Sequence, residues 1–102
     1  MRMILAALVL ALPACAGAPQ WTPADTQPIR EAKMTCAAAT YEAVGDPTCS
    51  TAYYRFVSGQ PSLSFRNDPG GAPRCSYVDM NRYAGQFMPS YQQCLAKAGV
   101  AP

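Results

Sequence analysis

The cysteines are the residues of this chain whose number and spacing say most about its chemistry. The 102 residues include Cys15, Cys36, Cys49, Cys75 and Cys94, and they include no histidine. Without an imidazole, the chain lacks the usual general base, the usual metal ligand and the usual pH switch. No CxxC pair is present, although such pairs are typical of zinc sites and dithiol redox centres. We therefore expect no metal site, no cofactor and no redox catalysis.

The carboxylates and serines do not form a catalytic set either. Glu31 and Glu42 lie three helical turns apart, which is too far for a glycosidase pair on one helix. The serines have no histidine to activate them, and the glycines at residues 70–71 lack the spacing and the lysine of a phosphate-binding loop. We expect the protein not to be an enzyme.

Residues 1–14, MRMILAALVLALPA, have the pattern of an export signal. Arg2 supplies a positive charge, and Ile4 to Leu12 form nine uninterrupted apolar residues. A membrane-spanning helix needs about 20 such residues, whereas the apolar part of a secretory signal has about 7–15. The segment therefore predicts a signal peptide.

The end of this signal resembles the lipobox of bacterial lipoprotein precursors. Leu12 stands three positions before Cys15 and the small Ala14 stands directly before it, while Pro13 departs from the commoner small or hydroxyl residue. The resemblance covers only the first 15 residues, and it implies that Cys15 becomes the acylated, membrane-anchoring N-terminus. In a Gram-negative cell it implies an outer-membrane location facing the periplasm, because Ala16 is not the aspartate associated with inner-membrane retention.

A soluble secreted or periplasmic protein is the alternative. Cleavage after Ala14-Cys15-Ala16, an A-x-A-like site, would also remove Cys15. Because a signal of only 14 to 16 residues is short for that route, the sequence favours the lipoprotein route.

The other four cysteines predict two disulfides in an exported domain. Such a small domain needs them, because each bridge adds about 3–4 kcal/mol in the chain-entropy model. If Cys36 and Cys49 both lie on helices of a hairpin, about 12 Å separates them along the axis, beyond the ~7 Å that a bridge allows. The nested pairs Cys36–Cys94 and Cys49–Cys75 are therefore favoured, with the crossed arrangement as the alternative.

Residues 15–26 are rich in proline and alanine and predict a tether behind the anchor. Extended at about 3.1 Å per residue, this tether would hold the domain some 30 Å from the lipid. Trp21 either inserts in the membrane interface or packs back on the domain.

Residues 27–102 predict one small domain of the mostly α class. A helix over 27–44 has a proline in its first turn and ends at Gly45. Asp46 and the following proline favour a second helix over 47–58, although the same residues alternate as in a strand. The two helices would form an αα-hairpin.

The rest of the domain predicts a long irregular loop and two C-terminal helices. The loop covers residues 59–75, where Leu63 and Phe65 form a short strand or fill the core. Helices follow over 76–88 and 89–98, divided at a proline that ends or kinks the first. The expected fold is thus a small disulfide-stapled helical domain with a long irregular loop.

Charge and aromatic residues indicate where the domain binds. A net charge of +2 with 14% charged residues is too weak for a surface that follows phosphates, so no nucleic acid is expected. Helical spacing assigns Tyr41, Tyr53 and Tyr91 to the core. The binding candidates are the exposed positions beside the second helix and in the turn-rich loop, namely Tyr54, Arg55, Arg66, Asn67, Asp68 and Arg74.

These observations favour a lipid-anchored envelope protein that acts as a non-catalytic binding module for a protein or an envelope polymer. One alternative is a structural component of an envelope assembly. Another is a secreted inhibitor whose loop 66–74 enters the cleft of a hydrolase or toxin.

Overall fold

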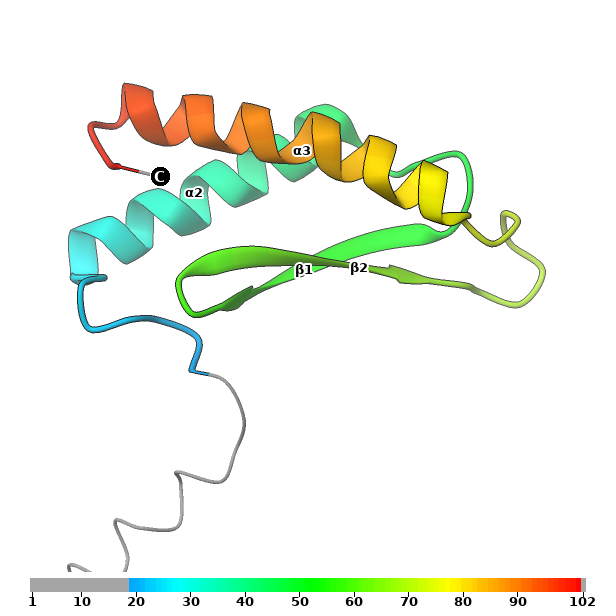
Figure 1. Ribbon diagram of the computed structural model, residues 1–102, viewed down its shortest axis with the longest axis horizontal. Coiled ribbons are helices and arrows are strands. Elements are labelled where there is room, and N and C mark those ends of the chain that lie inside the picture. The colour runs from blue at the N-terminus through cyan, green and yellow to red at the C-terminus, as the bar shows by residue number, and fades with distance from the viewer. Residues whose placement is uncertain (1–18, 102) are drawn as a thin grey trace, which may run out of the picture.

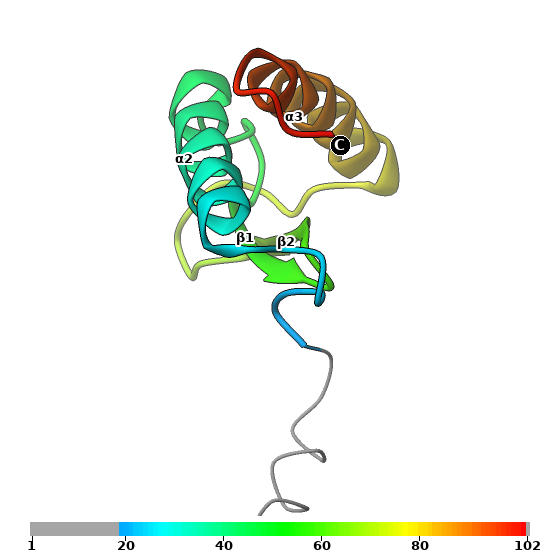
Figure 2. The same ribbon diagram turned by 90° about the vertical axis from the view of Figure 1, so that its left-hand side faces the viewer.

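The computed structural model describes residues 19–101, which form two helices and a two-stranded antiparallel sheet. In chain order these are α2 (Gln27–Val44), β1 (Thr51–Val57), β2 (Gln60–Arg66) and α3 (Tyr77–Lys97). The helices lie side by side over one face of the β1–β2 hairpin, and the opposite face carries no helix (Figures 1 and 2). The expected mostly α class is therefore wrong. Within the described residues the fold is a mixed α/β arrangement of two layers.

Helix α2 has the bounds that the sequence predicts. Gly45 follows its last residue with a positive φ of 73°, and the Gly45 N–H donates to the Tyr41 carbonyl. The face toward the core carries Cys36, Ala37 and Thr40, all buried. This helix is predictable because its start, its stop and its apolar face are all local signals.

The predicted second helix over 47–58 is wrong, because residues 51–57 form strand β1. Ala52 and Phe56 are four residues apart, so they share one face of a helix and also one face of a strand. Ser58 and Gly59 decide between these alternatives, since both have positive φ, 51° and 78°, and form a two-residue hairpin turn. The pairing of Val57 with Gln60 across this turn fixes the register.

The long irregular loop and the break at Pro89 also need correction. Part of the loop is strand β2, which places Leu63 opposite Tyr54 and Phe65 opposite Ala52 on the covered face. Helix α3 continues through Pro89 as one element. The buried residues Tyr83, Phe87, Tyr91 and Leu95 recur every four positions on both sides of this proline. Their packing compensates for the single hydrogen bond that a proline removes.

Two disulfides join these elements. Cys36–Cys94 links α2 to α3 with a Cα–Cα distance of 5.6 Å, and Cys49–Cys75 links the chain before β1 to the chain before α3 at 5.0 Å. These are the pairs of the nested arrangement. Two disulfides are compatible with an oxidising, extracellular type of compartment.

The segment before α2 packs on the domain from Pro19 onward. The hairpin-turn amides of Ser58 and Gly59 donate to the carbonyls of Pro19, at 2.7 Å, and Gln20, at 3.0 Å. The Trp21 ring lies 4.6 Å from the Phe56 ring, so this tryptophan packs back on the domain. The tether expected over 15–26 is therefore shortened at its C-terminal side. The predicted signal peptide and the lipidation site Cys15 lie outside the described residues.

Gly59 is the residue that this packing constrains most. It has a positive φ, and a Cβ atom there would overlap Oδ2 of Asp25. Gly70 is a matched control, because its φ of 74° is similar and a Cβ atom there would meet nothing within 4 Å.

We predict that Gly59→Ala destabilises the fold more than Gly70→Ala. The left-handed conformation costs about 1–2 kcal/mol in either variant. The overlap with Asp25 adds roughly 1–3 kcal/mol at Gly59 alone. Urea unfolding with both disulfides intact measures the difference, and equal losses in the two variants would contradict this close approach.

Candidate functional site

The six sequence-derived binding candidates do not form one site. Tyr54 and Arg55 lie in the middle of β1, whereas Arg66, Asn67, Asp68 and Arg74 lie at or beyond the far end of β2. Arg66 is paired with Thr51, four residues along β1 from Arg55, so about 13 Å of strand separates the two groups. They are two separate surfaces.

The far group is partly structural. The Arg66 guanidinium lies 3.0 Å from Oδ1 of Asp68, and Thr51 Oγ1 donates to Oδ2 of the same carboxylate. The Ser50 hydroxyl bonds the Asn67 side chain and accepts from the Cys75 N–H. Asn67 and Asp68 thus hold the start of the loop against β1. Arg74 is exposed.

The two neighbouring tyrosines of β1 have exchanged the roles that helical spacing assigns to them. Tyr53, expected in the core, is 46% exposed on the face without helices. Tyr54, expected at the surface, is half-buried on the inner face, with its ring 5.7 Å from that of Tyr41 and 6.0 Å from that of Phe87. The cause is the two-residue period of a strand, which separates adjacent side chains completely.

An open groove between α2 and the edge of β1 is the candidate binding site with the largest volume among the pockets of the described residues. Its volume is about 740 Å³. We call it the α2–β1 groove, and it is lined by Gln20, Met34, Ala38, Tyr54, Arg55 and Phe56. Only Tyr54 and Arg55 are among the candidates derived from sequence. Met34 and Ala38, four residues apart on a helix, are the signal that was available for the opposite wall.

Tyr41 of α2 occupies the backbone edge of β1 at Ala52, two residues from Tyr54 of the groove. Its hydroxyl donates to the Ala52 carbonyl at 2.6 Å, and the Ala52 N–H donates to Oδ1 of Asp46 at 3.1 Å. One helical turn earlier, Ala38 is too short to reach β1, and Met34 beyond it is 44% exposed. The groove exists because the small Ala38 stands one helical turn before the large Tyr41 on this side of α2.

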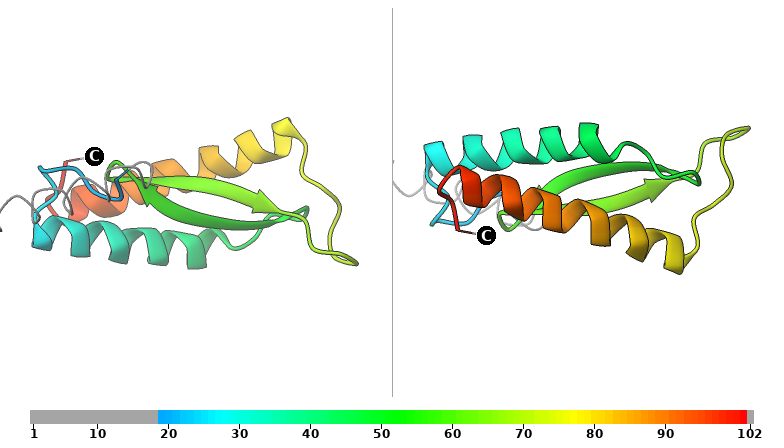
Figure 3. Two further views of the ribbon diagram at one scale, coloured as in Figure 1. Left: turned by 90° about the horizontal axis from the view of Figure 1, so that it is seen from below. Right: turned by 90° about the horizontal axis from the view of Figure 1, so that it is seen from above.

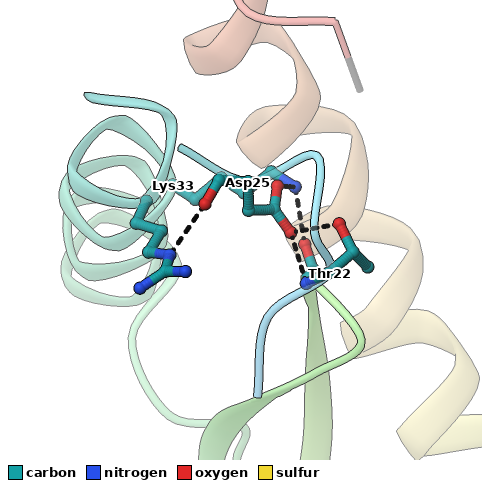
Figure 4. Close-up of polar contacts among 5 residues, drawn as sticks. Thr22, Asp25 and Lys33 are labelled. Atoms are coloured by element: carbon teal, nitrogen blue, oxygen red, sulfur yellow. Dashed lines mark hydrogen bonds and ion pairs between the residues drawn. The ribbon is translucent and has the colours of Figure 1, made fainter. Parts of the chain in front are cut away.

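A second, buried polar cluster joins the N-terminal segment to α2 and to the hairpin turn (Figure 4). The Lys33 ammonium donates to Oδ1 of Asp25 at 2.6 Å and to the Gly59 carbonyl at 2.9 Å. The other carboxylate oxygen of Asp25 accepts from the N–H and the hydroxyl of Thr22. With these partners, the cluster fixes the segment against the hairpin.

Asp25 and Tyr91 are two buried titratable groups that do not accept a proton at neutral pH. The hydrogen bond from Lys33, followed by those from Thr22, lowers the pKa of Asp25 to about 2, so this carboxylate is a weak base. Burial, followed by the charge of Asp25, raises the pKa of the Tyr91 hydroxyl to about 12, so it stays protonated. We assign both groups to structure.

Comparison with protein-family models, with curated proteins and with solved structures gives no significant match. Among residues 19–101, no cluster of three or more cysteine or carboxylate side chains is arranged to hold a metal ion. Neither of the two described helices combines the length and the apolar character that crossing a membrane requires.

The low pKa of Asp25 predicts how stability depends on pH. A carboxylate whose pKa is lower in the folded state stabilises the fold above its unfolded pKa, near 3.8, and loses this contribution as the pH falls toward 2. The stability difference between wild type and Asp25→Asn should therefore be largest above pH 4 and shrink toward pH 2.

Urea unfolding at pH 7, 4 and 2.5 measures this difference, and Glu42→Gln, at an exposed position of α2, is the control. A difference for Asp25→Asn that stays constant over this range would contradict the role of its charge.

Proposed function

We propose that this protein is an exported, lipid-anchored envelope protein that acts as a non-catalytic binding module. The resemblance of residues 12–15 to a lipobox supports acylation at Cys15. The two disulfides support export, because such bridges persist in oxidising compartments. The single observation that carries the binding role is the α2–β1 groove, whose lining includes the exposed apolar Met34 and the charged Arg55.

The short linker determines which end of the domain would face the membrane. Only residues 16–18 separate Cys15 from Pro19, and Pro19 is bonded to the hairpin turn. The four Cα–Cα steps from Cys15 to Pro19 span at most about 14 Å. In the anchored protein the hairpin turn lies near the lipid, and the loop after β2 is at the opposite end of the domain (Figures 1 and 3).

The loop end supports a second candidate function, inhibition of a hydrolase or toxin. Tyr77 and Val78 at the start of α3 are 82% and 65% exposed, and Arg74 is exposed just before them. The Cys49–Cys75 disulfide fixes this end of the domain. A fixed, exposed and partly apolar end is a suitable surface for a partner's cleft.

Acylation is tested by labelling cells with a palmitate analogue. We expect wild type to carry the label and to fractionate with membranes, and Cys15→Ser to lose both properties. Ala18→Ser, a serine placed beyond the lipobox, is the matched control and should behave as wild type. An unlabelled wild type found in the soluble fraction would leave the secreted alternative.

The binding surface is tested by placing a photo-crosslinking amino acid at single positions of the full chain in cells. We expect adducts from position 34 in the groove and none from position 92, an exposed site on α3 outside the groove. Adducts from position 74 with none from position 34 would contradict binding at the groove and would indicate that the loop end binds the partner.

A further inference from the structure

We propose that the α2–β1 groove binds an extended peptide segment of a partner protein, which adds to the free edge of β1 as a third strand. This inference rests on the binding role proposed above and specifies the chemistry of the partner. The segment carries an acidic residue flanked by apolar ones.

The register of the hairpin shows which backbone groups of β1 point away from β2. Val57 and Gln60 flank a two-residue turn, so they form a hydrogen-bonded pair, and the bonded pairs then alternate along the strands. The N–H and C=O groups of Ala52, Tyr54 and Phe56 accordingly point toward the free edge. Ala52 agrees with this, because both of its backbone groups bond side chains outside the hairpin.

Tyr54 and Phe56 are the part of this edge that is left open. Asp46 and Tyr41 occupy the edge at Ala52, and Pro19 and Gln20 occupy the turn beyond β1. Between these two sets of contacts, no residue of the described chain outside the hairpin forms a hydrogen bond with the backbone of Tyr54 or Phe56. Edge groups of this kind are what an added strand pairs with.

The groove has the shape to receive such a strand. An added strand lies about 4.8 Å from β1, which places it in the space that Ala38 leaves beside Tyr54 and Phe56. Side chains of the added strand that point inward would pack beneath α2 against Met34. The inward positions of the bound segment are therefore apolar.

Charge complementarity specifies the outward position. Arg55 is the only charged residue that lines the groove, and its side chain belongs to the face without helices. The ion pairs of the described residues are Lys33–Asp25, Arg66–Asp68 and Arg82–Asp79, and none of them uses Arg55. A residue opposite Arg55 in the added strand has its side chain on the same face, so a carboxylate there pairs with the guanidinium.

The experiment selects peptides from a display library of random 12-residue sequences on the full chain and measures their affinities as synthetic peptides. Ala38→Trp fills the groove from an exposed helical position, and Ala39→Trp, at the adjacent exposed alanine outside the groove, is the matched control. We expect Ala38→Trp to weaken binding at least tenfold and Ala39→Trp to change it less than twofold.

Two further measurements test the pairing. Arg55→Glu should weaken the binding of an acidic peptide at least fivefold, and it should bind the lysine-substituted form of that peptide better than wild type does. Lys97→Glu, at an exposed position of α3 outside the groove, should change neither affinity. The bound peptide should also slow amide hydrogen exchange at Tyr54 and Phe56.

The proposal is overturned if no peptide is enriched on wild type over Ala38→Trp, or if the enriched peptides bind Ala38→Trp equally well. It is also overturned if the Tyr54 and Phe56 amides are already protected without peptide. If the peptide-free protein shows this protection as a dimer, and Ala38→Trp abolishes both the protection and the dimer, a second copy of the chain occupies the groove. If the protected protein is a monomer, the chain's own N-terminal segment occupies it.

The strand-addition proposal can fail separately from the binding and anchoring proposals, and the experiments tell these failures apart. Adducts at position 34 that Ala38→Trp leaves unchanged would keep the binding role and remove strand addition. An unlabelled Cys15 would remove the anchor and leave the peptide affinities unaffected.

Discussion

The burial of one face of a two-stranded hairpin against two covalently linked helices is the constraint on which this fold depends. A hairpin of two strands is marginal by itself, so β1 and β2 require the helical layer. Tyr54 meets Phe87 of α3 on the inner face, and Tyr41 of α2 reaches the β1 backbone at Ala52. The Cys36–Cys94 disulfide keeps the two helices together over the sheet. It closes 58 residues of chain and contributes about 4 kcal/mol in the chain-entropy model.

The N-terminal segment fixes the other end of the same hairpin. Asp25 and Lys33 meet the turn at Gly59, where a side chain would not fit, and Trp21 packs against Phe56. The residues that resemble a tether in composition are therefore part of the folded domain from Pro19 onward. This brings the lipid anchor proposed at Cys15 within a few residues of the hairpin turn, so the anchor would restrict the orientation of the domain as well as its location.

The sequence predicted the local features of the fold, and it failed where two conformations share one pattern. The prediction of helix α2 is correct because the signals that define it are local. The helix predicted over 47–58 is wrong because a separation of four residues places Ala52 and Phe56 on one face in a helix and in a strand alike. The nested disulfide pairs are present although the helical hairpin from which they were derived is not. The groove was not predictable, since one of its walls is the strand that was assigned as a helix.

The open edge of β1 is narrow because the chain seals it on both sides. The side chains of Asp46 and Tyr41 occupy the edge at Ala52, and the Pro19–Gln20 backbone occupies the hairpin turn. An unprotected edge along a whole strand invites pairing with any other strand, which natural sheets avoid. An opening limited to Tyr54–Phe56, roofed by α2 and flanked by one arginine, admits a short segment and selects its charge. The same contacts that shorten the open edge of β1 would therefore make the remaining opening specific.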